Sequence, residues 1–426
     1  MAGTTVLSRL HRLDLDERRA HLDRAVAFEP SEWEGISATP ALREISDVMV
    51  ETAVGATPVP LGIAEGFLVD GRDVAVPLAV EEPSVIAAAS FAARLVAGSG
   101  GFHTWASEPL MSAQVFLERV DPEGEARLRD CGPKVAELLT PHLASLERRG
   151  GGFRGLSVTR RAGSATVRVD LLIDVRDAMG ANRLNTAAEL ASPLLERESG
   201  GRRLMAVLSN EAKDRLAGAS CEIPFARLRP GLGTGMEPAE AARRIAAASL
   251  IAQEDPSRAV THNKGIMNGI SSLALATMND TRAVEAAAHA WAARFGTYRG
   301  LSTWEAGDGT LKGRIELPLA LASVGGSVDF HPAARACLRV LGSPGGTELQ
   351  RIAAAVGLAQ NLAALLALVT DGIQKGHLRK HAARLAWKVG ARGNEVRPLA
   401  ERLDKDGITG EAEARRALGR LREGDR

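Results

Sequence analysis

The sequence predicts an α+β protein with more than one domain. Between Ser112 and Asn210 the hydrophobic periods change in the order strand, helix, strand, strand, helix, strand, which is typical of the ferredoxin-like fold. Alanine-rich helical patterns precede and follow this segment, and the chain of 426 residues is too long for a single core. We therefore expect a small βαββαβ unit beside a larger, mostly helical one.

The segment before this unit is predicted to contain helices and one strand. Two amphipathic helical stretches begin at Asp14 and Pro30. A strand at Arg72–Val80 and a helix at Val85–Val96 follow, so Glu82 lies at a strand-to-helix junction. A carboxylate stabilises a helix N-terminus by ~0.3–1 kcal/mol, so spacing alone leaves open whether Glu82 is structural or functional.

Within the βαββαβ unit, Ala162-Gly163-Ser164 is the expected hairpin turn. The turn from Asp174 to Asn182 is polar, contains a glycine and leads into a helix N-terminus, which is a favourable place for a phosphate or an amide-bearing ring. The predicted elements are strand Ala113–Val120, helix Lys134–Arg148, strands Leu156–Arg161 and Ala165–Val175, helix Asn182–Arg197 and strand Leu204–Ser209.

The stretch Thr261–Gly269, Thr-His-Asn-Lys-Gly-Ile-Met-Asn-Gly, has no periodic core pattern that explains it. We interpret it as a binding site, in which glycines let the backbone approach a ligand and Lys264 stabilises a developing oxyanion. The alternative is a surface loop with an incidental lysine. Asp280, before a predicted helix at Thr281–Arg294, is either a further site residue or the N-cap of that helix.

The final segment, Gly372–Arg426, is basic, with fourteen Lys or Arg against eight Asp or Glu. Gly372 and Gly376 predict a hinge, so we interpret the segment as a helical module that closes over a polyanionic ligand such as a nucleotide pyrophosphate. The alternative is a solvated helical tail.

Composition excludes several classes of protein. The formal net charge is +1 and the few aromatic residues are not interleaved with basic runs, so a nucleic-acid partner is not expected. Cys131, Cys221 and Cys337 lie far apart, which is typical of reduced thiols in a cytoplasmic protein. Met1–Leu22 lacks the apolar core of a signal peptide. The uncharged run Ile352–Thr370 is largely alanine, so we predict a buried core helix and no membrane span.

Six motifs together resemble hydroxymethylglutaryl-CoA reductase, in its class II soluble bacterial form. The motifs are Val80–Ser84, Asp177–Asn182, Thr261–Gly269, Asn279–Asp280, Gly357–Asn361 and Gln374–His377. The resemblance implies a large, mostly helical substrate and dimerisation domain, into which a small non-Rossmann dinucleotide domain is inserted, and a C-terminal helical flap. The expected boundaries are 1–110 and 213–371 for the large domain, 111–212 for the ferredoxin-like domain and 372–426 for the flap.

The resemblance also implies a division of chemical roles. Lys264 would stabilise the hemithioacetal oxyanion, and His377 would protonate the thiolate of coenzyme A. Glu82, beside Asp280, would exchange a proton with the aldehyde or alcohol oxygen. The implied substrate-binding residues are Ser84, Arg258, Thr261, Asn268, Gln360 and Asn361, with Arg258 paired to the free carboxylate. The implied dinucleotide-binding residues are Asp177, Ala178, Met179, Gly180, Ala181, Asn182 and Asn210.

The resemblance implies NAD(H), NADP(H) or both as cofactor, coenzyme A as co-substrate, and no metal. It also implies that the protein is a homodimer or an assembly of dimers. Thr52 and Leu143 depart from the family, Thr52 from an asparagine and Leu143 from an acidic residue of NAD-preferring members. Because His142, Arg148 and Arg149 lie near Leu143, we predict appreciable use of NADP(H). Glu147 could restore a preference for NAD.

Two other functions stay open on the sequence. His377 and His381 have an i, i+4 spacing that suits a metal-dependent hydrolase, although the residues between them include no carboxylate. An inactive acyl-CoA-binding relative is the other, but the four candidate catalytic residues Glu82, Lys264, Asp280 and His377 are all present. The direction of the reaction in the cell depends on metabolite levels.

Overall fold

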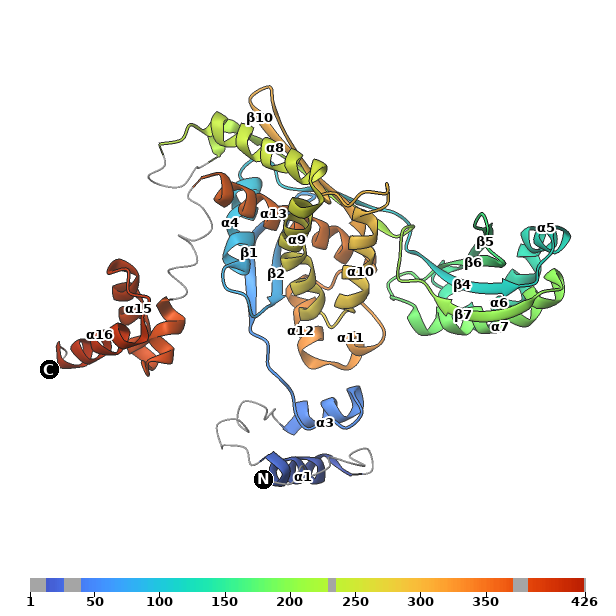
Figure 1. The fold of residues 1–426 in the computed structure, drawn as a ribbon, viewed down its shortest axis with the longest axis horizontal. Coiled ribbons are helices and arrows are strands. Elements are labelled where there is room, and N and C mark those ends of the chain that lie inside the picture. Colours follow the sequence, from blue (N-terminus) through green and yellow to red (C-terminus); the bar gives the residue numbers. More distant parts are fainter. Residues whose placement is uncertain (1–12, 27–39, 229–234, 371–381, 425–426) are drawn as a thin grey trace.

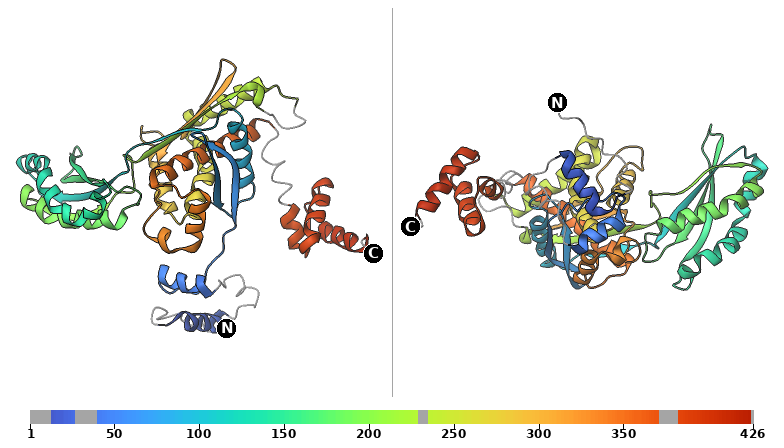
Figure 2. Two further views of the ribbon diagram at one scale, coloured as in Figure 1. Left: turned by 180° about the vertical axis from the view of Figure 1, so that it is seen from behind. Right: turned by 90° about the horizontal axis from the view of Figure 1, so that it is seen from below.

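The structure is a computed structural model that describes residues 13–26, 40–228, 235–370 and 382–424. A central helical body carries a small α/β unit at one end and a helical C-terminal module at the other, and the views in Figures 1 and 2 agree on this arrangement. The three largest clusters of buried apolar side chains follow these three parts, and the cluster of the small unit also includes Ala287 and Ala320 of the central body.

The described chain begins with two helices and a hairpin. Asp14 and Glu17 form a capping box at the first helix, because Glu17 N donates to Asp14 Oδ1 at 2.8 Å and Asp14 N donates to Glu17 Oε2 at 2.9 Å. The helix predicted from Pro30 begins outside the described residues. The elements are α1 (Leu15–Val26), α3 (Pro40–Met49), the antiparallel pair β1 (Leu61–Val69) and β2 (Arg72–Ala79), and α4 (Val85–Ala97).

The small unit has the predicted βαββαβ order and an antiparallel sheet with the strand order β5-β6-β4-β7. Helices α6 and α7 cover one face of this sheet (Figure 1). The elements are β4 (Leu110–Glu118), α5 (Pro122–Asp130), α6 (Gly132–Glu147), β5 (Gly152–Arg160), β6 (Thr166–Asp174), α7 (Ala181–Ser199) and β7 (Arg202–Leu208).

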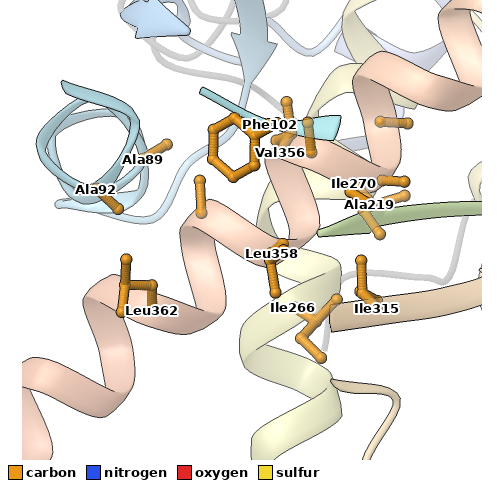
Figure 3. Close-up of a cluster of buried hydrophobic side chains, with 14 of the residues drawn as sticks. Ala89, Ala92, Phe102, Ala219, Ile266, Ile270, Ile315, Val356, Leu358 and Leu362 are labelled. Atoms are coloured by element: carbon orange, nitrogen blue, oxygen red, sulfur yellow. The ribbon is translucent and has the colours of Figure 1, made fainter. Parts of the chain in front are cut away.

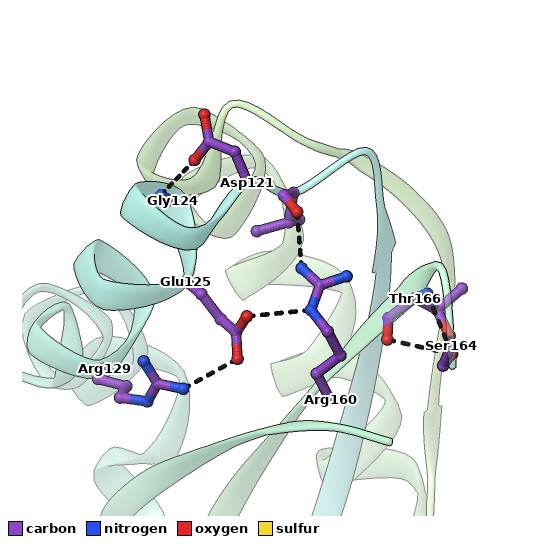
Figure 4. A network of polar contacts seen from close by, with 8 residues as sticks. Asp121, Gly124, Glu125, Arg129, Arg160, Ser164 and Thr166 are labelled. Atoms are coloured by element: carbon purple, nitrogen blue, oxygen red, sulfur yellow. Dashed lines mark hydrogen bonds and ion pairs between the residues drawn. The ribbon is translucent and has the colours of Figure 1, made fainter. Parts of the chain in front are cut away.

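Helix α5 was not predicted, because its sequence is mostly charged and only Gly124 and Leu128 are buried. Asp121 caps it by accepting from Gly124 N at 2.6 Å. The Glu125 carboxylate then accepts from Arg129 at 2.9 Å and from Arg160 of β5 at 3.0 Å, which joins α5 to the sheet edge (Figure 4).

The central body is built around one long helix, α13 (Gly346–Val369), which packs against α4, α9 and a second four-stranded antiparallel sheet of order β3-β8-β10-β9. Figure 3 shows Ile266 and Ile270 of α9 beside Val356 and Leu358 of α13. The remaining elements are β3 (His103–Ala106), β8 (Leu216–Pro224), η2 (Phe225–Arg227), α8 (Pro238–Glu254), α9 (Pro256–Ala276), α10 (Thr281–Ala292), β9 (Ser302–Gly307), β10 (Thr310–Pro318), α11 (Ser327–Phe330) and α12 (Pro332–Val340).

Helix α13 is long and apolar enough to cross a membrane, but most of its residues are buried inside the protein. A Cβ atom on Gly357 would lie 2.7 Å from Ile270 Cδ1, so a larger residue there would force Ile270 to shift where α9 and α13 approach each other. The prediction of a buried core helix is confirmed.

The C-terminal module contains η3 (Gly393–Glu395), α15 (Val396–Lys405) and α16 (Glu411–Gly424). Its own apolar cluster includes Ala386, Leu399 and Leu403. The hinge predicted around Gly372 and Gly376 lies outside the described residues.

The interpretation of Thr261–Gly269 as a stretch without a core pattern is wrong, because it lies inside the continuous helix α9. His262, Ile266 and Ile270 are buried on one face of this helix, so a helical period is present among the polar residues. Asp255 caps the helix by accepting from Ser257 N at 2.8 Å. Gly269 is needed for packing, since its Cβ would lie 2.9 Å from Val356 Cγ1 of α13.

Candidate active site

One face of α9 lines a cavity of about 550 Å³, which we call the α9 cavity. Arg258, Thr261, Lys264 and Asn268 recur every three or four residues, so their side chains form a stripe along one side of the helix. The junction between β2 and α4 and the C-terminal half of α13 form the other walls. All of the predicted substrate-binding residues, together with Glu82 and Lys264, line this cavity: Glu82, Ser84, Arg258, Thr261, Lys264, Asn268, Gln360 and Asn361.

Lys264 is the exposed cation of this stripe. Its side chain has no hydrogen bond or ion pair to any residue that the structure describes, so it is available to a ligand. Ser84 has a φ of 81° at the start of α4, where an L-residue is strained, and its side chain makes no capping hydrogen bond. Backbone strain of this kind is often found at binding sites.

A buried polar network supports the wall of the α9 cavity. Asn361 Oδ1 accepts from Trp304 Nε1 at 2.7 Å and from Ser302 Oγ at 2.9 Å, and Asn361 Nδ2 lies 3.1 Å from His262 Nε2. Burial, with a smaller effect of Arg258, lowers the pKa of His262 to about 4, so the imidazole is neutral at neutral pH. The network therefore fixes Asn361 without adding charge.

His262 was missed as a site residue by the sequence analysis. It lines the α9 cavity, and its Nδ1 atom is buried without a hydrogen-bond partner among the described residues, as is Gln360 Oε1. Two unpaired buried atoms beside the cavity are suited to polar groups of a ligand. The signal in the sequence is its position four residues after Arg258, on the same side of a helix. The neighbouring Asn263 is structural, because it bonds Arg299 O and Leu301 N, both at 2.8 Å.

A second cavity of about 570 Å³ continues from the first along α9 and α10. Glu82, Lys264 and Asn268 line both cavities, so the carboxylate and the ammonium group lie at their junction. Glu285 in the second cavity contacts His289 Nε2 at 3.2 Å and accepts a hydrogen bond from Ser271.

A third cavity, of about 310 Å³, lies at the N-terminus of α7, and we call it the α7 cavity. The loop Ala178–Asn182 forms one wall, and Val324–Val328 forms another. Gly180 has a φ of 86°, and a Cβ there would lie 2.5 Å from Val175 Cγ1, so glycine is required. Because no side chain caps α7, the amides of its first turn suit an anion such as the pyrophosphate of a dinucleotide.

Asp177 and Asn210 are not among the residues that line the α7 cavity. Asp177 Oδ1 accepts from Gly346 N at 2.7 Å, and its carbonyl oxygen accepts from Ser323 N at 2.9 Å, so this residue holds the small unit against the start of α13. Leu143 is buried in the core of the small unit, whereas Arg149 lines the cavity.

Asp280 also lines the α7 cavity and caps α10, accepting from Arg282 N and Ala283 N at 3.0 Å each. Twelve helical residues separate Lys264 from Ala276 at the end of α9, which corresponds to about 18 Å at 1.5 Å per residue. Asp280 itself lines neither of the two cavities that Lys264 lines, although the next two residues, Thr281 and Arg282, line the second cavity together with Lys264.

His377, the fourth predicted catalytic residue, lies outside the described residues, as does His381. Arg384 of the C-terminal module donates to the carbonyl oxygen of Glu81 at 3.0 Å, which joins this module to the loop that carries Glu82. Over the described ranges, no group of three or more His, Cys, Asp or Glu side chains could hold a metal ion.

Comparison with known proteins gives close relatives. Residues 14–382 match the family model described as hydroxymethylglutaryl-coenzyme A reductase. The chain is 40% identical over 421 residues to the 3-hydroxy-3-methylglutaryl-coenzyme A reductase of Archaeoglobus fulgidus, covering 97% of this chain and 94% of that protein. It is 36% identical over 337 residues to a probable 3-hydroxy-3-methylglutaryl-coenzyme A reductase of Borreliella burgdorferi, and this match covers 79% of this chain and 77% of that protein.

Solved structures are similar as well. The class II 3-hydroxy-3-methylglutaryl-CoA reductase from Streptococcus pneumoniae, bound to NADPH in open conformations, superposes with a TM-score of 0.74 at 39% identity. The match covers 96% of this chain and 100% of that one.

Proposed function

The chain belongs to the hydroxymethylglutaryl-CoA reductase family, and from that premise we propose how its residues divide the reaction between two cavities. It is an oxidoreductase that uses a nicotinamide cofactor. A reduced nicotinamide, when bound, would supply one hydride, so two cofactor molecules in succession are needed to take the thioester of hydroxymethylglutaryl-CoA to the alcohol of mevalonate with release of coenzyme A. The observation that carries the proposal is the convergence of eight predicted residues on the α9 cavity.

We propose that the α9 cavity holds the hydroxymethylglutaryl group. Arg258 pairs with the free carboxylate, and the polar side chains of Ser84, Thr261 and Asn268 orient the group. Lys264 donates to the oxygen that becomes negative as the thioester carbonyl is reduced, and it does so again for the aldehyde. Its lack of a protein partner supports this role, because no existing ion pair has to be broken.

Glu82 exchanges a proton with the oxygen of the aldehyde or alcohol. Its position beside Lys264, at the junction of two cavities, supports a role in which the carboxyl group protonates the oxygen of the aldehyde as the alcohol forms. His377 protonates the thiolate of coenzyme A, a role that rests on the match of Gln374–His377 to the family motif.

The α7 cavity holds the dinucleotide, with the pyrophosphate at the first turn of α7. We propose that NADP(H) is used appreciably. Arg149 lines this cavity and can meet a 2′-phosphate, whereas Leu143 faces the core and Glu147 is not among the lining residues.

The active site is completed by a second copy of the chain. Since Asp280 lines the α7 cavity and neither of the two cavities that Lys264 lines, we propose that Asp280 and the dinucleotide of one subunit meet Lys264 and the substrate of its partner. The enzyme is accordingly a dimer, or an assembly of dimers, and works in the cytoplasm.

Subunit complementation tests this arrangement. Lys264→Ala and Asp280→Ala each inactivate every site of their own homodimer. Mixed dimers keep one site with both residues intact, so co-expression is expected to restore about a quarter of wild-type turnover if dimers form at random. A mixture as inactive as its two components would show that both residues act within one chain.

Cofactor choice is tested separately. We expect specificity constants for NADPH and NADH that differ by less than about a hundredfold, and a selective loss with NADPH in Arg149→Ala. A larger preference for NADH in the wild type would contradict the assignment of Arg149.

A further inference from the structure

Arg215 lies where the chain returns from the small unit to the central body, one residue before β8. Its side chain is fully buried. A buried guanidinium is costly unless its N–H groups are paired, so the partners of Arg215 show what the residue is for.

The guanidinium donates to backbone carbonyls on both sides of the domain junction. Nη1 donates to Ala178 O at 2.9 Å, in the loop before α7. Nη2 donates to Leu321 O at 2.6 Å, in the segment that follows β10. Ala178 and Ala322, the residue after Leu321, both line the α7 cavity.

A third partner is Gln350 of α13. With its amide oxygen turned toward the guanidinium, Oε1 accepts from Arg215 Nε at 2.9 Å and from Nη2 at 2.8 Å. Gln350 lies ten residues before Gln360, which lines the α9 cavity, on the same rigid helix. One side chain therefore bonds two walls of the α7 cavity and the helix that forms a wall of the α9 cavity.

Charge alone does not explain these contacts. The nearest carboxylates have other partners, because Asp177 accepts from Gly346 N, and Asp174 forms ion pairs with Arg154 at 3.0 Å and Arg176 at 3.2 Å. Burial lowers the pKa of Arg215 to about 10, while Asp177 and Asp174 act in the opposite direction, so the group stays protonated at neutral pH. The planar fork of N–H groups is what reaches three acceptors at once, and a lysine cannot replace it.

We propose that Arg215 is a positioning residue for the reductase reaction, which holds the loop Ala178–Asn182 against the segment 321–328 and fixes the α7 cavity relative to α13. The proposal rests on the assignment of the dinucleotide to the α7 cavity. Without these bonds the two walls sample other arrangements, and apparent affinity falls by the fraction of molecules that keep the competent one.

The test compares two ligands in two variants. Arg215→Lys keeps the charge but loses the fork, and Gln350→Leu removes only the link to α13. Kd for NADPH is measured by nicotinamide fluorescence and Kd for coenzyme A by calorimetry, with steady-state KM and kcat alongside. Arg351→Lys is the matched control, because Arg351 lies next to Gln350 and, among the residues that the structure describes, its Nη2 donates to a carbonyl of the central body alone, Thr104 O, at 3.4 Å.

Arg215→Lys is expected to raise the Kd for NADPH about tenfold, which corresponds to about one molecule in ten keeping the arrangement that binds NADPH. The Kd for coenzyme A should stay within about twofold of wild type. Gln350→Leu is expected to raise the Kd for NADPH by a smaller factor, and the control Arg351→Lys is expected to leave both dissociation constants unchanged. Unchanged NADPH binding in Arg215→Lys, or equal weakening of both ligands, would overturn the proposal. If Arg215→Lys does not fold, Gln350→Leu decides by the same comparison.

A third variant, Asn182→Trp, tests whether the dinucleotide binds in the α7 cavity, independently of the role proposed for Arg215. A bulky side chain in the wall of the α7 cavity must weaken NADPH binding if the dinucleotide lies there. If it does not, the proposed cofactor site is wrong, whatever the outcome for Arg215.

Discussion

Replacing Lys264 by methionine should remove catalysis and leave stability unchanged. The side chain is exposed and has no hydrogen bond or ion pair within the described part of the chain, and methionine has a helix propensity close to that of lysine. A surface change of this kind alters the free energy of unfolding by no more than about 0.5 kcal/mol. Loss of a group that stabilises an oxyanion costs about 10²–10³ in kcat, or roughly 3–4 kcal/mol in the transition state.

The assay follows the absorbance of the reduced nicotinamide with two substrates, hydroxymethylglutaryl-CoA and mevaldehyde. Both reductions place negative charge on an oxygen beside Lys264, so both rates should fall together. Lys312→Met is the matched control, since Lys312 is an exposed lysine on β10 whose partner is Glu222 at 3.3 Å. A Lys264→Met protein with an unchanged urea midpoint and a kcat within tenfold of wild type would refute the assigned role.

Three further predictions concern histidines and the C-terminal module. His377→Ala should lower reduction of the thioester by about 10²–10⁴ and spare mevaldehyde, which has no thiolate to protonate, and equal losses would argue against a role at the thiolate. Deletion of Gly372–Arg426 should abolish thioester turnover but leave a soluble protein by gel filtration, because the module has its own apolar cluster, whereas aggregation would mean that it covers core surface. His262→Gln should flatten the pH dependence of unfolding. The folded-state pKa of about 4 lies below the unfolded value of 6.5, so the wild type loses about 3 kcal/mol as the pH falls from 6.5 to 4, and an equal loss in the variant would refute this account.

The sheet of the small unit was predictable because its strands alternate and a glycine-containing turn joins two of them. Strand β4 buries Met111, Ala113, Val115 and Leu117 and leaves the residues between them partly exposed. Helix α5 gave no such signal, since it buries little apolar surface and depends on Asp121 and on the ion pair of Glu125 with Arg160.

The candidate site was predicted in residue identity but not in local structure. Glycine and asparagine lower helix propensity, so the stretch around Lys264 did not resemble a helix, yet tertiary packing on α13 overrides that preference. The partner of Asp177 is Gly346, 169 residues further along the chain, and no local pattern reveals such a contact. Sequence reasoning identifies residues with chemical potential, whereas burial and distant partners decide which of them bind ligand.

A helix in place of a loop at Lys264 has a mechanistic consequence. The ammonium group must hold the same position relative to the substrate for two successive hydride transfers, and side chains on rigid elements are positioned more precisely than those on loops. Gly269 of α9 and Gly357 of α13 allow the two helices to pack closely, because a Cβ on either would lie within 3 Å of the opposite helix. That close packing brings Gln360 and Asn361 to the same cavity as Lys264, with His262 and Trp304 fixing the asparagine from behind. Gly269 and Gly357 therefore contribute through helix packing, whereas Gly265 lines the α9 cavity, where a Cβ atom would meet open space.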